Sequence, residues 1–279
     1  MPLELFWGNE THVGVWEMYR EIRPLIFRLQ PEQAHNVTIQ LLRLAGSQPI
    51  GRVLLRTLFR PVRRGPEVKA FGLTFPNPVG MAAGYDKDGF AWRGLAELGF
   101  GHIEVGTVTT HPQSGTPQPR VFRLVEEEAV INRMGFPNRG SEFMVRRLQG
   151  KRPRGLVLGV NIGKHITTPL EEATGDYLSL LRTFAPLSDY LTINVSSPNT
   201  PGLRNLQSRA ALEQLLKPLA NERRSIASQL GRQVPLLVKL APDLAPADLD
   251  DALDVIFSTG MDGIVASNTT IRRPEWNTD

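Results

Sequence analysis

The chain is organised around the stretch Leu191-Thr-Ile-Asn194-Val-Ser-Ser197-Pro-Asn199-Thr-Pro-Gly-Leu-Arg-Asn205. It begins as an apolar, β-branched run, which is typical of a buried parallel strand. It continues as a loop that holds Asn, Ser, Pro, Gly and Arg. An ordinary polar turn needs only a Gly or Pro and some polar residues. This loop instead sets amides and hydroxyls at the carboxyl end of a strand, where α/β folds carry their chemistry.

The composition is that of a soluble globular protein with one large α/β domain or two small ones. The chain has 279 residues, of which 41% are hydrophobic and 22% are charged. It has no Cys, which excludes disulfides, thiolate metal sites and a cysteine nucleophile. The five His residues are scattered without ligand spacing on a helix, so we expect no metal. No apolar run is long enough to span a bilayer, and no signal or transit peptide is seen.

Positive charge is concentrated in residues 1–64. This segment holds nine Arg, no Lys and five Glu, whereas residues 65–279 hold 23 basic and 23 acidic residues. The formal charge of +4 therefore comes from the first 64 residues. The aromatic residues of this segment do not interleave with its Arg residues on one face, so we do not expect a nucleic-acid partner.

The same segment predicts three helices. Ile22, Leu25, Ile26 and Leu29 form an amphipathic stripe, with Trp16 and Tyr19 one turn before it. A second helix is predicted from Pro31 to Gly46 and a third from about Ile50 to Phe59. Basic amphipathic helices of this kind can lie on an anionic membrane surface, or they can form a cap packed on the main domain. The two interpretations are compatible.

After Gly65 the pattern becomes strand, loop, helix, repeated, which predicts βαβ units and a parallel sheet. A hairpin or entry strand is expected over Val68–Phe75, and a hairpin insertion over Arg120–Arg133. Six buried strands are predicted at Pro78–Ala83, His102–Val108, Leu156–Ile162, Tyr190–Val195, Leu236–Leu240 and Gly263–Ala266. Helices are predicted near 89–98, 140–149, 175–185, 208–230 and 246–259.

Two architectures fit this pattern, an open doubly wound sheet and a barrel. Polar residues follow nearly every strand rather than one switch point, which favours the barrel. No Gly-x-Gly-x-x-Gly opens a helix after the first strand, so a dinucleotide site has no support. The run Gly159-Val-Asn-Ile-Gly-Lys-His165 is one residue too short for a phosphate-binding P-loop, and it has His165 where Ser or Thr is required.

Asn and Lys recur at the predicted strand ends. A single such residue is usually a cap or a solvated side chain. Five Asn and two Lys on one rim are harder to explain in that way. Asn presents a donor and an acceptor, which suits the amide edges of a flat heterocycle. Lys supplies charge for a carboxylate, or for a ring that becomes anionic on reduction.

Four motifs together resemble those of dihydroorotate dehydrogenases, in particular the membrane-associated, quinone-dependent class. They are Asn77-Pro-Val-Gly-Met-Ala-Ala-Gly-Tyr-Asp-Lys-Asp-Gly89, Val121-Phe-Arg123 with Ile131-Asn-Arg-Met-Gly-Phe136, the stretch Asn194–Asn205, and Ser267-Asn-Thr-Thr270. The resemblance runs from about residue 18 to the end of the chain. It implies an FMN-binding (β/α)8 TIM barrel over residues 65–279, preceded by a small helical domain over residues 1–64.

The resemblance implies oxidation of (S)-dihydroorotate to orotate in the synthesis of UMP, with FMN taking the hydride and a membrane quinone taking the electrons. Ser197 would be the catalytic base. FMN would be bound by Ala83, Gly84, Tyr85, Asp86, Lys87, Thr107, Asn161, Asn194, Lys239 and Ser267. Dihydroorotate would be bound by Lys87, Asn132, Arg133, Met134, Gly135, Phe136, Asn194, Asn199, Asn268 and Thr269. His35 and Arg123 match residues near the quinone tunnel.

The soluble class of this family uses a cysteine base, so the absence of Cys and the N-terminal helices agree on the quinone-dependent class. The expected location is the cytoplasmic face of a bacterial cell membrane, as a peripheral protein. Six of eight barrel strands are expected here, so the loops after strands seven and eight, which grip the flavin phosphate, are expected outside these residues. Two alternatives stay open, a related FMN barrel acting on another pyrimidine, and an inactive barrel fragment with membrane-surface helices.

Overall fold

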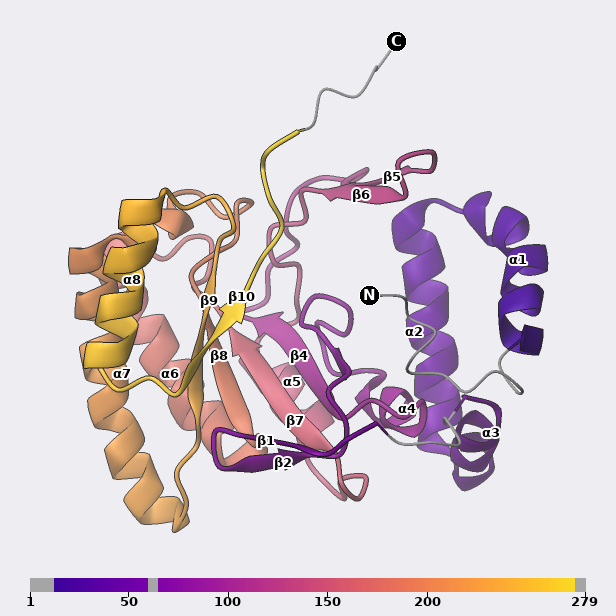
Figure 1. Ribbon diagram of the computed structural model, residues 1–279, viewed down its shortest axis with the longest axis horizontal. Helices are drawn as coiled ribbons and strands as arrows, with labels where there is room; N and C mark the ends of the chain where they lie inside the picture. Colours follow the sequence, from indigo (N-terminus) through magenta and orange to yellow (C-terminus); the bar gives the residue numbers. More distant parts are fainter. Residues whose placement is uncertain (1–12, 60–64, 274–279) are drawn as a thin grey trace.

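Three helices form the N-terminal part of the molecule, as predicted. The computed structural model describes residues 13–59 and 65–273, with side chains from Tyr19 onward; His12 and the Trp16 side chain lie outside this part. The helices are α1 (Val13–Phe27), α2 (Pro31–Ser47) and α3 (Pro49–Phe59), and they lie together at one side of the sheet (Figure 1). Both α2 and α3 begin at a proline, which suits the first helical position because its N–H would be unpaired there.

The second helix, α2, packs closely on the main domain. Ala34, Ile39 and Gly46 are its buried residues. A Cβ at Gly46 would come within 2.4 Å of the backbone nitrogen of Gly94 in α4 (Trp92–Glu97), so the two helices meet backbone to backbone. Ile39 belongs to the main hydrophobic core. The opposite face of α2 carries exposed leucines, among them Leu41 and Leu44.

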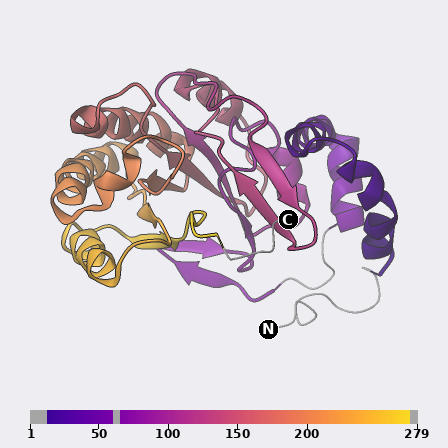
Figure 2. The same cartoon turned by 90° about the horizontal axis from the view of Figure 1, so that it is seen from above.

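The central sheet has six parallel strands in the order β10-β9-β8-β7-β4-β3. Seen from above, it curls like part of a barrel, with helices around its outer side (Figure 2). The strands are β3 (Gly80–Met81), β4 (His102–Val108), β7 (Val157–Ile162), β8 (Tyr190–Asn194), β9 (Leu236–Leu240) and β10 (Gly263–Ala266). The six predicted strands and their barrel-type curvature are therefore confirmed.

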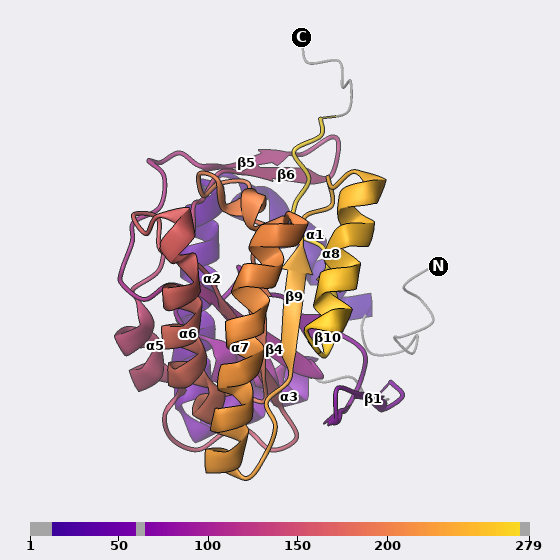
Figure 3. The same ribbon diagram turned by 90° about the vertical axis from the view of Figure 1, so that its left-hand side faces the viewer.

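The helices that follow the strands cover the outer side of the sheet (Figure 3). They are α5 (Ser141–Leu148), α6 (Ala173–Phe184), α7 (Arg209–Leu230) and α8 (Pro246–Ser258). Short 3-10 turns occupy Leu170–Glu172, Ala185–Leu187 and Leu203–Gln207. The apolar residues of β4, β7, β8 and β9 that face the covering helices form one core with the apolar faces of α6 and α7. Burial of this apolar surface is the main stabilising contribution to the sheet.

Two hairpins close opposite ends of the sheet. The hairpin of β1 (Val68–Ala70) and β2 (Leu73–Phe75) lies at the amino-terminal ends of the strands (Figure 1). There Phe75 packs with Val157, Tyr190 and Leu237. The hairpin of β5 (Val121–Leu124) and β6 (Ala129–Asn132) lies above the carboxyl-terminal ends. Both hairpins were predicted from the sequence.

Candidate active site

A pocket of about 320 Å³ lies at the carboxyl-terminal ends of the strands and is covered by the β5–β6 hairpin. Most of the residues predicted from the family motifs line it. They are Ala83, Gly84, Lys87, Thr107, Asn132, Met134, Gly135, Phe136, Asn194, Ser197, Asn199, Lys239, Asn268 and Thr269. The sequence did not identify two further lining residues, Val121 and Val130 of the hairpin. They add an apolar wall to a site that is otherwise rich in amides.

Five of the residues predicted to bind flavin or substrate lie elsewhere. Asn161 is fully buried beneath the pocket. Asp86 is also buried, and its carboxylate accepts hydrogen bonds from the backbone N–H groups of Phe90 and Ala91 at 2.8 and 2.7 Å. Asp86 and Tyr85 face a neighbouring cavity. Arg133 is exposed and lies over the ring of Phe122, and Ser267 is exposed at the end of β10.

A hydrogen-bonded network fixes the amides at the floor of the pocket. Asn194 donates to Thr107 Oγ1 and to Asn161 Oδ1, both at 3.0 Å, and Thr107 donates to Asn161 Oδ1 at 2.6 Å. Asn161 in turn donates to the carboxylate of Glu104 at 2.8 Å. Glu104 also accepts from Tyr190 at 3.1 Å and from Thr192 at 2.8 Å. Because every member is satisfied, the network holds the amide orientations in place.

A second set of contacts holds the loop that carries Ser197. Ser196 donates to Asn194 Oδ1 at 2.8 Å and accepts from Asn268 at 3.0 Å. Arg204 donates to the carbonyl oxygen of Ser196 at 3.0 Å and pairs with Asp243 at 2.9 Å. It also donates to the carbonyl oxygen of Thr269 at 3.1 Å. The loop after β8 is thereby tied to the loops after β9 and β10.

The hydroxyl of Ser197 faces a nearly dry site. Ser197 is 4% exposed, and its Oγ accepts the backbone N–H of Asn199 at 3.2 Å. Thr200, on the same loop, has a buried hydroxyl without a hydrogen-bond partner among the described residues. A buried hydroxyl without a partner is uncommon in native proteins. No pattern in the sequence distinguishes Thr200 from an ordinary loop threonine.

Lys239 also lines the pocket. The residue is 8% exposed, yet its side-chain ammonium makes no hydrogen bond or ion pair within residues 13–59 and 65–273. An ammonium that faces a pocket without a protein acceptor is free to pair with a bound ligand. Lys239 therefore suits a ligand that brings a carbonyl oxygen or negative charge to the pocket.

A second cavity, of about 510 Å³, adjoins the pocket and shares Lys87 and Met134 with it. His35 lines this cavity and packs edge-on against Tyr85, with ring centroids 5.0 Å apart. Glu32 and Arg120 form an ion pair here at 2.6 Å, which joins α2 to the segment before β5. Arg123 lies outside both cavities, where it donates to the carbonyl oxygen of Leu29 at 2.9 Å.

The family model for dihydroorotate dehydrogenase matches residues 66–279. The chain belongs to the dihydroorotate dehydrogenase family. It is 51% identical over 259 residues to a dihydroorotate dehydrogenase (quinone) of Halorhodospira halophila, an alignment that covers 92% of this chain and 73% of that protein. A protein of the same description from Azotobacter vinelandii is 48% identical over 256 residues, covering 92% and 72% of the two chains.

Solved structures agree with this assignment to the dihydroorotate dehydrogenase family. The enzyme of Eimeria tenella in complex with ferulenol superimposes with a TM-score of 0.79 at 36% identity, over 90% of this chain and 71% of that one. The ligand-free form of the same enzyme gives a TM-score of 0.76 at 39% identity, over 88% and 70%.

The residues present fit the flavin that dihydroorotate dehydrogenases use. Lys239 offers the pocket a cation without a carboxylate partner among the described residues. Gly84 has φ of +103°, and a Cβ there would meet nothing within 4 Å, so its backbone borders open space. Thr107 and Asn194 add polar groups whose positions are fixed by the network. A flat ring with carbonyl and N–H edges matches this set.

No helix of the described part is both long and apolar enough to cross a bilayer. In the same part, no cluster of three or more His, Asp or Glu side chains is arranged to hold a metal ion.

Replacing His35 by Gln is expected to reduce the pH dependence of stability. The pKa of His35 is lowered from 6.5 to about 4, mainly because the ring is buried and secondly because of the charge of Lys87. The charge of Glu32 opposes this shift. Between these pH values the unfolded chain binds a proton at this position and the folded chain does not. Stability from neutral His35 is therefore present above pH 6.5 and is lost as the pH falls toward 4.

The measurement is urea unfolding of both chains at about pH 7.5 and about pH 4.5. Since His35 is partly exposed, we expect its replacement to shrink the difference in unfolding free energy by about 1–3 kcal/mol. Burial raises the pKa of Asp86 to about 6, which acts in the opposite direction but is common to both chains. An unchanged difference would show that His35 is protonated in the folded state.

Proposed function

We propose that this chain oxidises (S)-dihydroorotate to orotate, with FMN as the hydride acceptor and a membrane quinone as the electron acceptor, in the synthesis of UMP. The observation that carries the proposal is the buried Ser197 in one pocket with Asn132, Asn199 and Lys239. Identities of about one half to quinone-dependent dihydroorotate dehydrogenases support it.

The substrate is held by four amide side chains from three segments, Asn132, Asn194 with Asn199, and Asn268, which all line the pocket. Among the described residues, the Asn132 amide keeps a free N–H donor and the Asn199 amide keeps a free oxygen acceptor for the amide edges of the pyrimidine. Asn199 donates to Asn132 at 3.4 Å, so these two amides lie side by side in the wall of the pocket. Lys87 supplies a cation for the substrate carboxylate. These contacts orient the reacting carbons towards Ser197.

Ser197 acts as the base that removes the C5 proton while the C6 hydride leaves. FMN, when bound in this pocket, would supply the hydride acceptor and the connection to the quinone. A serine hydroxyl is a weak base in water, so it needs a relay that takes its own proton, and it needs a site from which water is excluded. The 4% exposure of Ser197 and the apolar cover from Val121 and Val130 meet the second requirement.

The test is spectroscopic. The purified chain should show the visible absorbance of bound flavin, and anaerobic dihydroorotate should bleach it. Added orotate should quench the flavin fluorescence, which separates this substrate from other pyrimidines. A flavin-loaded protein that is bleached by another pyrimidine but not by dihydroorotate would contradict the assignment.

Residues 1–64 are proposed to form the membrane and quinone domain. Within the described part, α1–α3 expose Leu25, Leu41, Leu44, Ile50 and Val53, and all are more than half exposed. Exposed apolar residues beside arginines suit the interface of an anionic membrane. His35 lines the cavity next to the active-site pocket. The location proposed is peripheral, on the cytoplasmic face of the cell membrane.

The double variant Leu41→Glu/Leu44→Glu is expected to weaken binding to phosphatidylglycerol vesicles by at least about tenfold. These leucines are 62% and 66% exposed, so the change removes apolar contact with lipid and adds repulsion without opening the core. Turnover with a long-chain quinone in vesicles should fall with it, whereas a water-soluble quinone should still be reduced.

The matched control is Ser225→Glu/Gln229→Glu, which adds the same charge to exposed positions of α7. It should bind vesicles like the parent chain. Equal vesicle binding by the two variants would show that α2 does not face the membrane. Point substitutions are preferable to removal of the helices, because Ile39 of α2 is part of the main core.

A further inference from the structure

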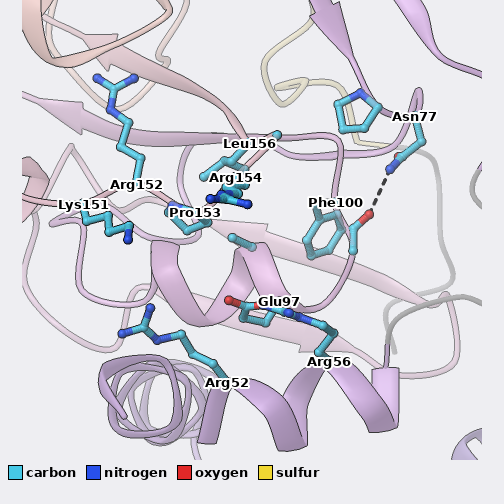
Figure 4. Close-up of a pocket in the computed structure, with 14 residues that line it drawn as sticks. Arg52, Arg56, Asn77, Glu97, Phe100, Lys151, Arg152, Pro153, Arg154 and Leu156 are labelled. Atoms are coloured by element: carbon cyan, nitrogen blue, oxygen red, sulfur yellow. Dashed lines mark hydrogen bonds and ion pairs between the residues drawn. The ribbon is translucent and has the colours of Figure 1, made fainter. Parts of the chain in front are cut away.

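A separate pocket of about 530 Å³ lies at the amino-terminal ends of β3, β4 and β7, opposite the active-site end of the sheet. In Figure 4, Arg52 and Arg56 reach into it from α3, and Lys151 and Arg154 come from the segment across from them. Asn77 donates to the carbonyl oxygen of Gly99 at 2.9 Å and closes one wall. We call this cavity the basic pocket.

Cations greatly outnumber carboxylates in the basic pocket. Its lining holds Arg52, Arg56, Lys151, Arg152 and Arg154, but Glu97 is its one acidic residue. Arg56 pairs with Glu97 at 2.6 Å, and Arg152 pairs with Asp189 at 3.1 Å. Arg52, Lys151 and Arg154 have no carboxylate partner in the described part of the chain. The pocket therefore has a strong positive potential.

Arg52 carries an unpaired donor in the basic pocket. Its Nε–H group is buried and has no hydrogen-bond acceptor among the described residues. A buried donor in this condition is rare, because the lost hydration is not replaced. Arg93 lies nearby, and burial together with the charges of Arg147 and Arg52 lowers the pKa of Arg93. Arg52 is thus held close to other cations, with a donor that an anion would satisfy.

We propose that the basic pocket binds a phosphate-bearing anion, either a soluble phosphate ester or the headgroup of an anionic phospholipid. The guanidinium N–H donors on two sides of the pocket match the several oxygens of a phosphate. A single carboxylate would leave most of these N–H donors unused. The volume accommodates a phosphate with an attached organic group. Phe100 and Leu156 give that group an apolar wall.

Both sources are compatible with the position of α3. The same helix that carries Arg52 exposes Ile50, Val53 and Leu54, which would lie among acyl chains if the headgroup belonged to a lipid. A soluble ester would need only the pocket. The two sources therefore differ in whether binding requires an acyl chain.

The experiment measures binding of two probes by titration calorimetry on the full chain, glycerol 3-phosphate and dihexanoylphosphatidylglycerol below its micellar concentration. The pocket variant is Arg52→Gln/Arg154→Gln. The control variant, Arg146→Gln/Arg224→Gln, removes the same charge from exposed positions on α5 and α7. Loss of two charge-assisted contacts should raise the dissociation constant of the pocket variant at least about tenfold. The control should stay within about twofold of the parent chain.

If glycerol 3-phosphate binds the parent chain and the control variant but not the pocket variant, the result supports a soluble ester. If only the lipid probe binds the parent chain, and the pocket variant loses that binding, the result supports a lipid headgroup. If the parent chain binds neither probe, or if the two variants bind both probes equally, the proposal is overturned. Arg154→Gln, at an exposed position, guards against misfolding of the double variant and should by itself weaken binding severalfold. Its flavin bleaching by dihydroorotate should match the parent rate, because the basic pocket lies at the other ends of the strands.

Discussion

Replacement of Ser197 by alanine is expected to slow the bleaching of bound flavin by dihydroorotate by roughly two to four orders of magnitude, as for loss of a general base. Flavin content should be unchanged, because the Ser197 side chain takes no part in the network that joins Glu104, Asn161, Thr107 and Asn194. Its Oγ accepts only the nearby N–H of Asn199. The measurement is anaerobic stopped-flow absorbance.

Two further variants separate a base from a structural residue. Ser197→Cys should recover part of the rate, and that rate should rise with pH as the thiol ionises. Ser225→Ala removes a hydroxyl from an exposed position of α7 and should leave the rate unchanged. If Ser197→Ala bleaches the flavin at the parent rate, Ser197 is not the base.

The strands were predictable because their signal is local. Tyr190–Asn194 and Leu236–Leu240 are short, fully buried apolar runs bounded by polar or turn residues. The predicted strand Pro78–Ala83 shrinks to Gly80–Met81, because Pro78 has no N–H to donate and Gly84 turns the chain with φ of +103°. The helix predicted over 89–98 is shorter for a related reason. Gly89 has φ of +67°, so α4 begins only at Trp92.

The floor of the candidate site was only half predictable. Asn161 and Asn194 follow apolar runs, so they were recognised as strand-end amides. Glu104 was not recognised, because it sits inside the run His102–Val108, where a carboxylate gives no indication of its partners. Those partners, Asn161, Tyr190 and Thr192, lie 57 to 88 residues away in sequence. Only the register of β4, β7 and β8 brings them together.

The motif also could not predict which way each side chain points. Asn132 and Arg133 are consecutive, and the family pattern assigned both to the substrate. Asn132 lines the pocket, whereas Arg133 is exposed and donates to the carbonyl oxygen of Pro119 at 3.2 Å. Alternate residues of a strand face opposite sides, and Asn132 is the last residue of β6. Arg133 as a substrate ligand stays a prediction.

Replacement of Lys239 by methionine is expected to slow flavin bleaching by dihydroorotate by roughly two to three orders of magnitude, the usual effect of removing one electrostatic stabiliser. The same change should not destabilise the flavin-free chain. Lys239 is 8% exposed and has no partner in the described residues, so methionine removes a poorly compensated charge while it keeps most of the side-chain volume.

A loss of rate without a loss of stability makes the prediction specific to a functional lysine. A structural lysine would lower the thermal midpoint of the flavin-free chain when replaced, and it would leave the bleaching rate near the parent value. Lys217→Met is the matched control, because Lys217 is exposed and pairs with Glu213 at 2.6 Å on α7. Its loss should cost well under about 1 kcal/mol and should not change the rate. A Lys239→Met chain that melts earlier and reacts at the parent rate would remove Lys239 from the flavin site.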